Sequence, residues 1–142
     1  MKPNEGRLQT GEHILAKILE NKIINCKVRI AKFFSDYGEV EFLTTYDLRK
    51  IPLEDLNFEI NKIVKSNLNV NIQIFNKMEI KDFEKLRVNK ELEKIRIVSI
   101  GDFDSRPCGD PHINKTLEIG NFYVEKIKRV GNNRYRITFR VE

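Results

Sequence analysis

The run of residues 134–141 alternates strictly between apolar and polar side chains. In a β-strand successive side chains point to opposite faces, so the apolar residues from Tyr135 to Val141 share one face. The other face carries three arginines: Arg134, Arg136 and Arg140. Such a strand keeps one face in a core and one in water, which is typical of an antiparallel sheet covered on one side. The fold must therefore supply elements that cover the apolar face.

Five further segments have strand character. Residues 26–30 and 39–42 alternate on either side of a turn-like stretch, which predicts a hairpin. Residues 70–74 also alternate, whereas 95–100 are largely apolar and are expected to form a central strand. Residues 122–127 are expected to pair with the last strand, because Gly131-Asn-Asn133 has the composition of a hairpin turn.

Two amphipathic segments can cover the sheet. Apolar residues recur every three or four positions through residues 53–68, and Pro52 suits the first turn of a helix that runs to about Asn67. A second helix is predicted over about residues 10–20, where Thr10 can cap it through its hydroxyl. Residues 80–86 look like a short helix. The expected fold is α+β: two layers, with a mainly antiparallel sheet and helices packed on one face.

The length of 142 residues fits one domain, 1–142, in which residues 1–8 form a short polar arm. A domain of this size buries roughly two-thirds of its unfolded surface. Hydrophobic residues make up 40% of the chain and charged residues 33%, which is an ordinary soluble composition. We find no apolar run long enough for a membrane span and no signal peptide, so we expect a cytoplasmic protein without membrane partners.

The net charge of +5 makes polyanions plausible partners, because cations on a protein release counterions when they neutralise phosphates. The arginine row is a candidate RNA-binding surface, formed by Arg134, Arg136 and Arg140. A solvated outer sheet face explains the same row at least as well. The charge thus supports an RNA partner without requiring one.

Cys108 and His112 form a C-x-x-x-H pair in a loop rich in Gly and Pro. Thiolate and imidazole are preferred zinc ligands, and this spacing lets one turn aim both at a single ion. The pair alone is a weak signal, because cysteine is often a small buried hydrophobe and a loop histidine is often solvated. Cys26 could in principle form a disulfide with Cys108, but a cytosolic setting favours free thiols, and Cys26 is expected to pack in a strand.

His13, the first of two histidines in the sequence, lies four residues after Gln9. Residues at this spacing share one helix face. The apolar stripe of the helix lies almost opposite that face, so His13 is not expected to be a core histidine. It is either a surface residue or part of a site on the other side of the helix.

Four motifs resemble a known family: R-L-Q-T-G-E-H-I-L from Arg7, I-R-I-V-S-I-G-D from Ile95, C-G-D-P-H from Cys108 and T-L-E-I-G-N-F from Thr116. They are similar to the editing domain shared by alanyl- and threonyl-tRNA synthetases, which also occurs in stand-alone alanyl-tRNA editing proteins. The family pattern is H-x-x-x-H followed downstream by C-x-x-x-H and T-G-E-I-G. The resemblance implies the same two-layer fold, in a short form without an N-terminal β-barrel.

The resemblance implies a zinc site in which His13, Cys108 and His112 are the ligands. Three protein ligands are typical of a catalytic zinc that keeps its fourth position for water or substrate. The first histidine of the family pattern falls on Gln9 here. Gln9 could bind the metal, hydrogen-bond a metal-bound water, or mark a site that has lost affinity, and we favour the second role. Gln9, Thr10 and Glu12 are the candidate catalytic residues.

The implied function is a trans-editing hydrolase that deacylates mischarged tRNA, with serine or glycine on alanine tRNA as substrate. Serine on threonine tRNA is an alternative substrate, and a catalytically silent, zinc-stabilised tRNA-binding module is an alternative function. Glu12 and Glu118 are candidate general bases, although carboxylates near helix starts or in loops commonly have no such role. Asp102 and Asp104 could orient a ligand histidine, but a turn-forming pair is the favoured interpretation.

Overall fold

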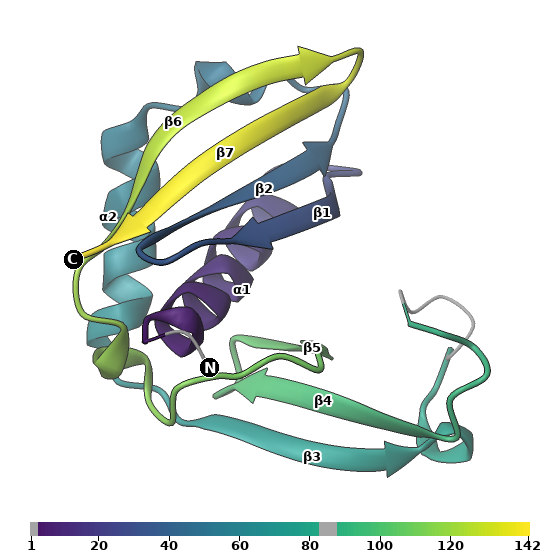
Figure 1. Ribbon diagram of the computed structural model, residues 1–142. Helices are drawn as coiled ribbons and strands as arrows, with labels where there is room; N and C mark the ends of the chain where they lie inside the picture. The colour runs from purple at the N-terminus through teal and green to yellow at the C-terminus, as the bar shows by residue number, and fades with distance from the viewer. Residues whose placement is uncertain (1–2, 83–87) are drawn as a thin grey trace.

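The computed structural model describes residues 3–82 and 88–142, whose strands form two antiparallel sheets (Figure 1). The four-stranded sheet has the order β1-β2-β7-β6, with bounds Lys27–Phe33, Tyr37–Leu43, Arg134–Val141 and Phe122–Gly131. The three-stranded sheet has the order β3-β4-β5, with bounds Val70–Asn76, Lys94–Ile100 and Asp104–Pro107. The helices are α1 (Glu5–Lys22) and α2 (Leu53–Lys65), with short 3₁₀ turns η1 (Leu48–Lys50), η2 (Lys77–Glu79) and η4 (Thr116–Ile119). The expected α+β class is confirmed.

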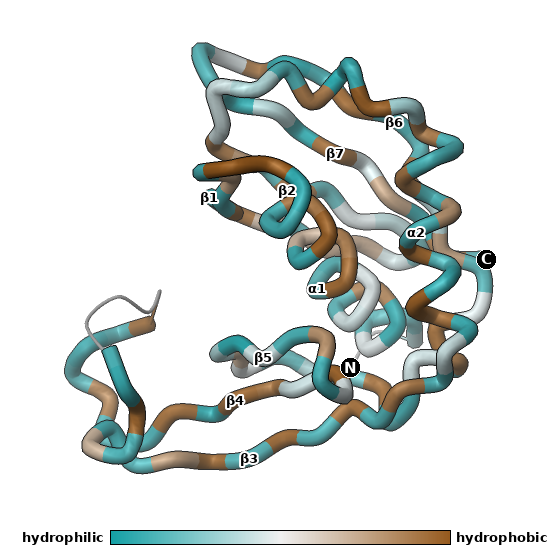
Figure 2. Tube along the Cα trace, turned by 180° about the vertical axis from the view of Figure 1, so that it is seen from behind, coloured by the Kyte–Doolittle hydropathy of each residue, from teal (hydrophilic) through white to brown (hydrophobic). Residues whose placement is uncertain are grey.

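The four-stranded sheet is covered on one face by α1 and α2, which lie behind it in Figure 1 and in front of it in Figure 2. Its covered face carries Val40 and Phe42 from β2 and Ile137 and Phe139 from β7, all fully buried. β2 and β7 pair antiparallel with Val40 opposite Ile137, so these side chains share that face. The alternation at residues 134–141 thus predicted the covered side of the sheet.

The three-stranded sheet joins the core at the end nearest α1. Val70, Val98 and Ile100 are buried there, whereas Ile74 further along β3 is 67% exposed. The rest of the β3–β4 hairpin projects away from the helices (Figure 1). β4 is the central strand of this sheet, as its apolar sequence predicted. The division of the strands into two sheets was not anticipated, because alternation reveals faces but not strand partners.

Helix α1 starts at Glu5, so the predicted polar arm is wrong from that residue onward. The helix is longer because its first turns pack against the body of the protein: Leu8 is fully buried, and Arg7 Nε donates a hydrogen bond to the Ile119 carbonyl at 2.8 Å. The capping role of Thr10 is also wrong, because Asn4 holds the N-cap position and Thr10 lies in the second turn.

Two remaining expectations concern short segments. Of the helix predicted at 80–86, residues 80–82 form a bend and a turn, and residues 83–86 lie outside the described part of the chain. Cys26 is buried immediately before β1, and both it and Cys108 are free thiols. In the parts of the chain that the structure describes, no helix has the length and apolar character to cross a membrane.

Gly11 allows α1 to approach the sheet. A Cβ at this position would lie 2.1 Å from Phe122 Cε2, and Phe122 is fully enclosed and stacked on Phe139 with ring centroids 5.3 Å apart. We predict that Gly11→Ala lowers the free energy of unfolding by about 1–3 kcal/mol, because overpacking outweighs the better helix propensity of alanine. Urea unfolding followed by circular dichroism measures this change.

Gly131→Ala is the matched control, since a Cβ there would meet its nearest neighbouring atom at an ordinary 3.5 Å. A Phe122→Leu substitution added to Gly11→Ala should recover part of the loss by removing the clashing ring atoms. Equal stability of Gly11→Ala and the wild type would show that the helix is not held against Phe122 in this way.

Candidate functional site

The loop that carries Cys108 and His112 follows directly after β5. Arg96 in the neighbouring strand β4 holds its first half: Nη1 donates hydrogen bonds to the carbonyl oxygens of Cys108 at 2.8 Å and Asp110 at 2.7 Å. The Cys108 amide in turn donates to the Arg96 carbonyl at 3.1 Å. Three hydrogen bonds between one residue and one short turn fix the direction in which the Cys108 side chain leaves the sheet.

The second half of the loop packs on the first turns of α1. A Cβ at Gly6 would lie 3.2 Å from the His112 carbonyl carbon, so the glycine permits this close approach. Thr10 Oγ1 is hydrogen-bonded to His112 Nδ1 at 2.9 Å and accepts a longer bond from the Ile113 amide at 3.4 Å. Thr10 is fully buried, so it acts on the ring of His112 and not on solvent.

These contacts bring together His13, Cys108 and His112, whose ligand atoms all lie within 4.8 Å of one another. His112 Nε2 is 3.5 Å from Cys108 Sγ, and the two imidazole rings meet edge to face with centroids 4.6 Å apart. His13 is only 3% exposed, so the alternative of a surface histidine is wrong. The face of α1 opposite its apolar stripe is buried too, beneath the loop.

The three side chains fit a metal ion of the zinc type. His13 Nδ1 is buried and has no hydrogen-bond partner among the described residues, which is costly unless another ligand occupies it. The Thr10 hydroxyl engages Nδ1 of His112, which directs Nε2 of that ring toward Cys108, as an outer hydrogen bond does for a metal-bound histidine. Two imidazoles and one thiolate form a nitrogen and sulfur donor set that suits zinc.

Burial controls the protonation of this cluster. It lowers the pKa of His13 to about 2 and that of His112 to about 4. The nearby His112 ring also lowers the pKa of His13, and the Arg96 charge also lowers the pKa of His112. Both rings are therefore neutral near pH 7 and keep a lone pair. Burial raises the pKa of the Cys108 thiol to about 11. A metal must displace that proton on binding.

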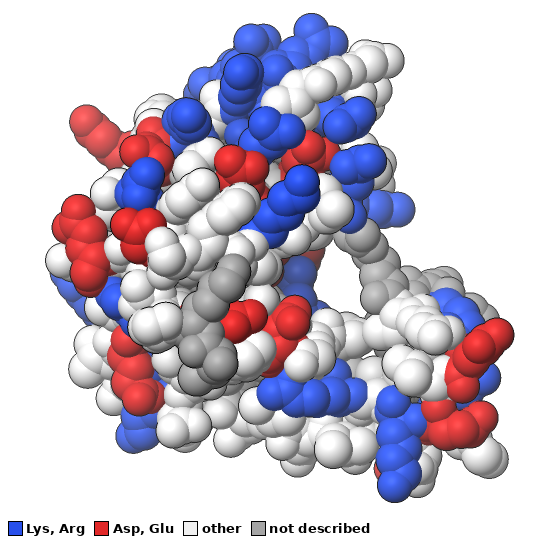
Figure 3. Space-filling model, in the orientation of Figure 1, with Lys and Arg blue, Asp and Glu red and all other residues white. Residues whose placement is uncertain are grey.

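A groove of about 800 Å³ opens beside the cluster, lined by α1, β1 and β5, and Gln9, Glu12, His13 and Cys108 all contribute to its wall. Figure 3 shows the surface hollowed between the two sheets. Burial raises the pKa of Glu12 to about 7, against the opposing attraction of Arg106. Glu12 can therefore accept or release a proton near neutral pH.

Arg106 crosses the groove from β5 to α1. It pairs with Asp104 at 2.8 Å and with Glu20 at 2.9 Å. Burial acts to lower the pKa of Arg106, but these carboxylates outweigh it and raise the pKa. Asp104 therefore accepts a hydrogen bond from Arg106 and does not orient a ligand histidine. Asp102 is exposed in the preceding turn. Glu118 is exposed and accepts a hydrogen bond from the Lys115 amide at 2.7 Å, which caps η4 instead of serving the groove.

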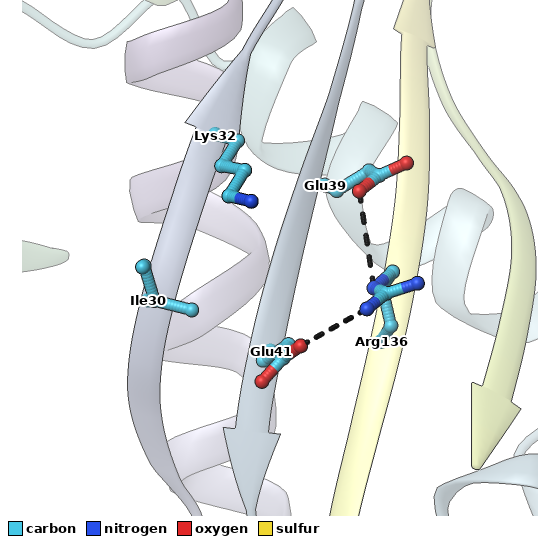
Figure 4. A pocket seen from close by; sticks show the side chains of 5 residues that line it. All are labelled: Ile30, Lys32, Glu39, Glu41 and Arg136. Atoms are coloured by element: carbon cyan, nitrogen blue, oxygen red, sulfur yellow. Dashed lines mark hydrogen bonds and ion pairs between the residues drawn. The ribbon is translucent and has the colours of Figure 1, made fainter. Parts of the chain in front are cut away.

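The arginine row lies on the uncovered face of the four-stranded sheet. Arg134 and Arg136 both pair with Glu41, at 3.3 and 3.2 Å, and Arg136 also contacts Glu39 at 3.8 Å. Figure 4 shows Arg136 between these two carboxylates. The three side chains line a small hollow of about 30 Å³. Arg140 pairs with Asp36 and Glu125, both at 3.3 Å. The row is thus balanced by carboxylates and lies outside the groove, and its RNA-binding role stays a prediction.

Neither Arg96 nor Arg106 was predicted from the sequence as a residue that shapes the site. The signal for Arg96 was present, because a charged residue inside an apolar central strand must find partners in the fold. The partners of Arg106 lie on α1 and on its own strand, so only the tertiary structure identifies Glu20.

Comparisons with known proteins point to one family. Residues 95–138 match the family described as threonyl and alanyl tRNA synthetase second additional domain. The chain is 35% identical over 135 residues to the alanyl-tRNA editing protein AlaX-L of Pyrococcus horikoshii, an alignment that covers 94% of this chain and 33% of the relative. It is 25% identical to AlaX-M of Methanosarcina acetivorans, covering 94% and 56%.

A further relative is the alanine–tRNA ligase of Wigglesworthia glossinidia brevipalpis, 33% identical over 95 residues that cover 63% of this chain and 11% of the ligase. The chain thus spans a third of AlaX-L and a smaller part of the ligase. The matched segment 95–138 contains the Cys108–His112 loop and its clamp Arg96, and the longer alignment to AlaX-L covers almost the whole chain. Residues 95–138 therefore belong to the threonyl and alanyl tRNA synthetase second additional domain family.

Proposed function

We propose that this chain hydrolyses the ester bond between tRNA and a wrongly attached amino acid. The observation that carries the proposal is the convergence of His13, Cys108 and His112 on the wall of one large groove. The names of AlaX-L and AlaX-M, both alanyl-tRNA editing proteins, support this reaction class. Such an activity works where tRNA is charged, which agrees with the cytoplasmic location expected from the sequence.

The substrate we propose is alanine tRNA that carries serine or glycine, and serine on threonine tRNA is the alternative. These amino acids differ from the correct ones by one or two small groups. Contacts to such groups discriminate by only about 1–3 kcal/mol in a pocket, so a second hydrolytic site is a chemically sensible solution.

In this proposal His13, Cys108 and His112 hold a zinc ion, which would polarise the ester carbonyl and lower the pKa of water. The raised pKa of Glu12 suits a proton acceptor at neutral pH, and its position on the groove wall lets it reach a water there. The Gln9 carboxamide, on the same wall, would hydrogen-bond that water. Thr10 orients the His112 ring and is a positioning residue.

A second candidate function is a catalytically silent, zinc-stabilised tRNA-binding module. It is favoured by Gln9, which stands where the family pattern has a histidine. A carboxamide is a weaker zinc ligand than an imidazole. Turnover of mischarged tRNA separates this candidate from the hydrolase.

We predict about one zinc ion per chain in the wild type, and its loss in Cys108→Ala and His112→Ala, because each substitution removes one of three ligands. Elemental analysis of the gently purified proteins measures the content. Cys26→Ala is the matched control: this cysteine is also a free thiol but lies before β1, outside the ligand cluster. Stoichiometric zinc in His112→Ala would remove that residue from the ligand set.

Gln9→His should tighten zinc binding at least tenfold, because Gln9 precedes His13 by one helical turn and an imidazole there can add a fourth strong ligand. Competition with a chromophoric chelator measures the affinity. An unchanged zinc affinity would mean that residue 9 does not face the ion.

Deacylation of alanine tRNA that carries serine tests the function itself. The wild type should release serine, and Cys108→Ala should lose at least a hundredfold in kcat/KM while it keeps its circular dichroism spectrum and its binding of tRNA. Cys26→Ala should behave like the wild type. Tight tRNA binding by a zinc-loaded wild type that releases no serine would instead establish the silent module.

A further inference from the structure

The groove that contains the cluster has lysines on two of its walls. On α1, Gln9, His13 and Lys17 follow one another at four-residue intervals and all line the groove. The helical rise places Lys17 about 6 Å further along the axis than His13. Lys27 begins β1 and lines the facing side.

These two lysines differ from the other cations near the site. Neither forms an ion pair with a residue in the described ranges 3–82 and 88–142. Arg106, in the same groove, is bound by Asp104 and Glu20, and the arginines of the outer sheet face are each bound by carboxylates. The charge of Lys17 and of Lys27 therefore remains available to an anion that enters the groove.

β1 is the outermost strand of its sheet and β5 the outermost strand of the other, so the groove runs between two open sheet edges. A groove of this shape accepts an extended chain in preference to a compact ligand. Under the proposed function that chain is the single-stranded end of a tRNA, which has one phosphate for each nucleotide. One nucleoside separates the first phosphate from the reacting ester. This separation is comparable to the distance of about 6 Å along the helix axis between His13 and Lys17.

We propose that Lys17 and Lys27 bind backbone phosphates of the nucleotides that precede the aminoacylated end, and so guide the strand along the groove between α1 and β1. This inference rests on the proposed function. Lysine ammonium groups act as point charges without base recognition, so the contacts serve any tRNA sequence. The arginine row on the outer face contributes less, because its charges are already neutralised within the protein.

The test uses Lys17→Gln, Lys27→Gln and the double variant, with Lys65→Gln as control, since Lys65 is exposed at the end of α2 and does not line the groove. For each protein, kcat/KM is measured over a range of salt with seryl-tRNA and with seryl-adenosine, which has no phosphate. Contact with a single-stranded phosphate contributes about 0.7 to the slope of log affinity against log salt.

We expect each groove substitution to reduce that slope by about 0.7 and the double variant by about 1.4, through KM rather than kcat. The ratio of kcat/KM for seryl-tRNA to kcat/KM for seryl-adenosine should fall in each single variant and fall further in the double variant. Slopes equal to that of Lys65→Gln in an active enzyme would overturn the inference and leave the proposed function intact. Absence of turnover with both substrates would overturn the function. In that case the affinity for a fluorescent RNA hairpin with a single-stranded 3′ end is measured over the same range of salt. The inference then requires the same reduction of the salt slope in the groove variants relative to Lys65→Gln.

Discussion

The packing of α1 against the segment 112–119 determines the rest of this structure. Gly6 admits the backbone of that segment, Thr10 holds the ring of His112, and Arg7 binds the carbonyl of Ile119. Through Gly11 the same helix also lies directly on Phe122 of the sheet. One helix therefore joins the two ends of the chain, and the cluster of His13, Cys108 and His112 exists only where that helix and the loop meet.

This arrangement has an energetic consequence. Burial of a polar atom without a partner costs about 1–3 kcal/mol, and the buried Nδ1 of His13 has none in the described residues. A metal ion held by His13, Cys108 and His112 would satisfy the lone pairs of all three side chains. Stabilisation of the metal-bound form would thus offset a cost that the metal-free protein carries.

Local sequence patterns predicted much of the fold, because they report which face of an element is buried. The alternation from Tyr135 to Val141 and the helical spacing through residues 53–68 both matched the structure. The start of α1 could not be predicted in this way, since Arg7 in its first turn donates hydrogen bonds to the carbonyls of Ile119 and Glu142, both more than a hundred positions away. For the same reason no local pattern could assign β3 and β4 to a separate sheet.

The candidate site was predictable in part. The spacing of Cys108 and His112 suggested a ligand pair, and the i,i+4 relation of Gln9 and His13 placed both on one helix face, but the family resemblance was needed to join the two ends. The clamp by Arg96 and the ion pairs of Arg106 depend on tertiary contacts. The same holds for the arginine row, whose carboxylate partners lie on β2, β6 and the β1–β2 turn.

X-ray absorption spectroscopy of the zinc-loaded protein tests most directly whether one ion joins the two ends of the chain. We predict one sulfur neighbour at about 2.3 Å and two imidazole nitrogens at about 2.0–2.1 Å, with one further light atom in the fourth position. In His13→Ala one of the imidazole nitrogens should disappear while the sulfur remains. A zinc environment without sulfur, or one that His13→Ala leaves unchanged, would show that His13, Cys108 and His112 do not share one ion.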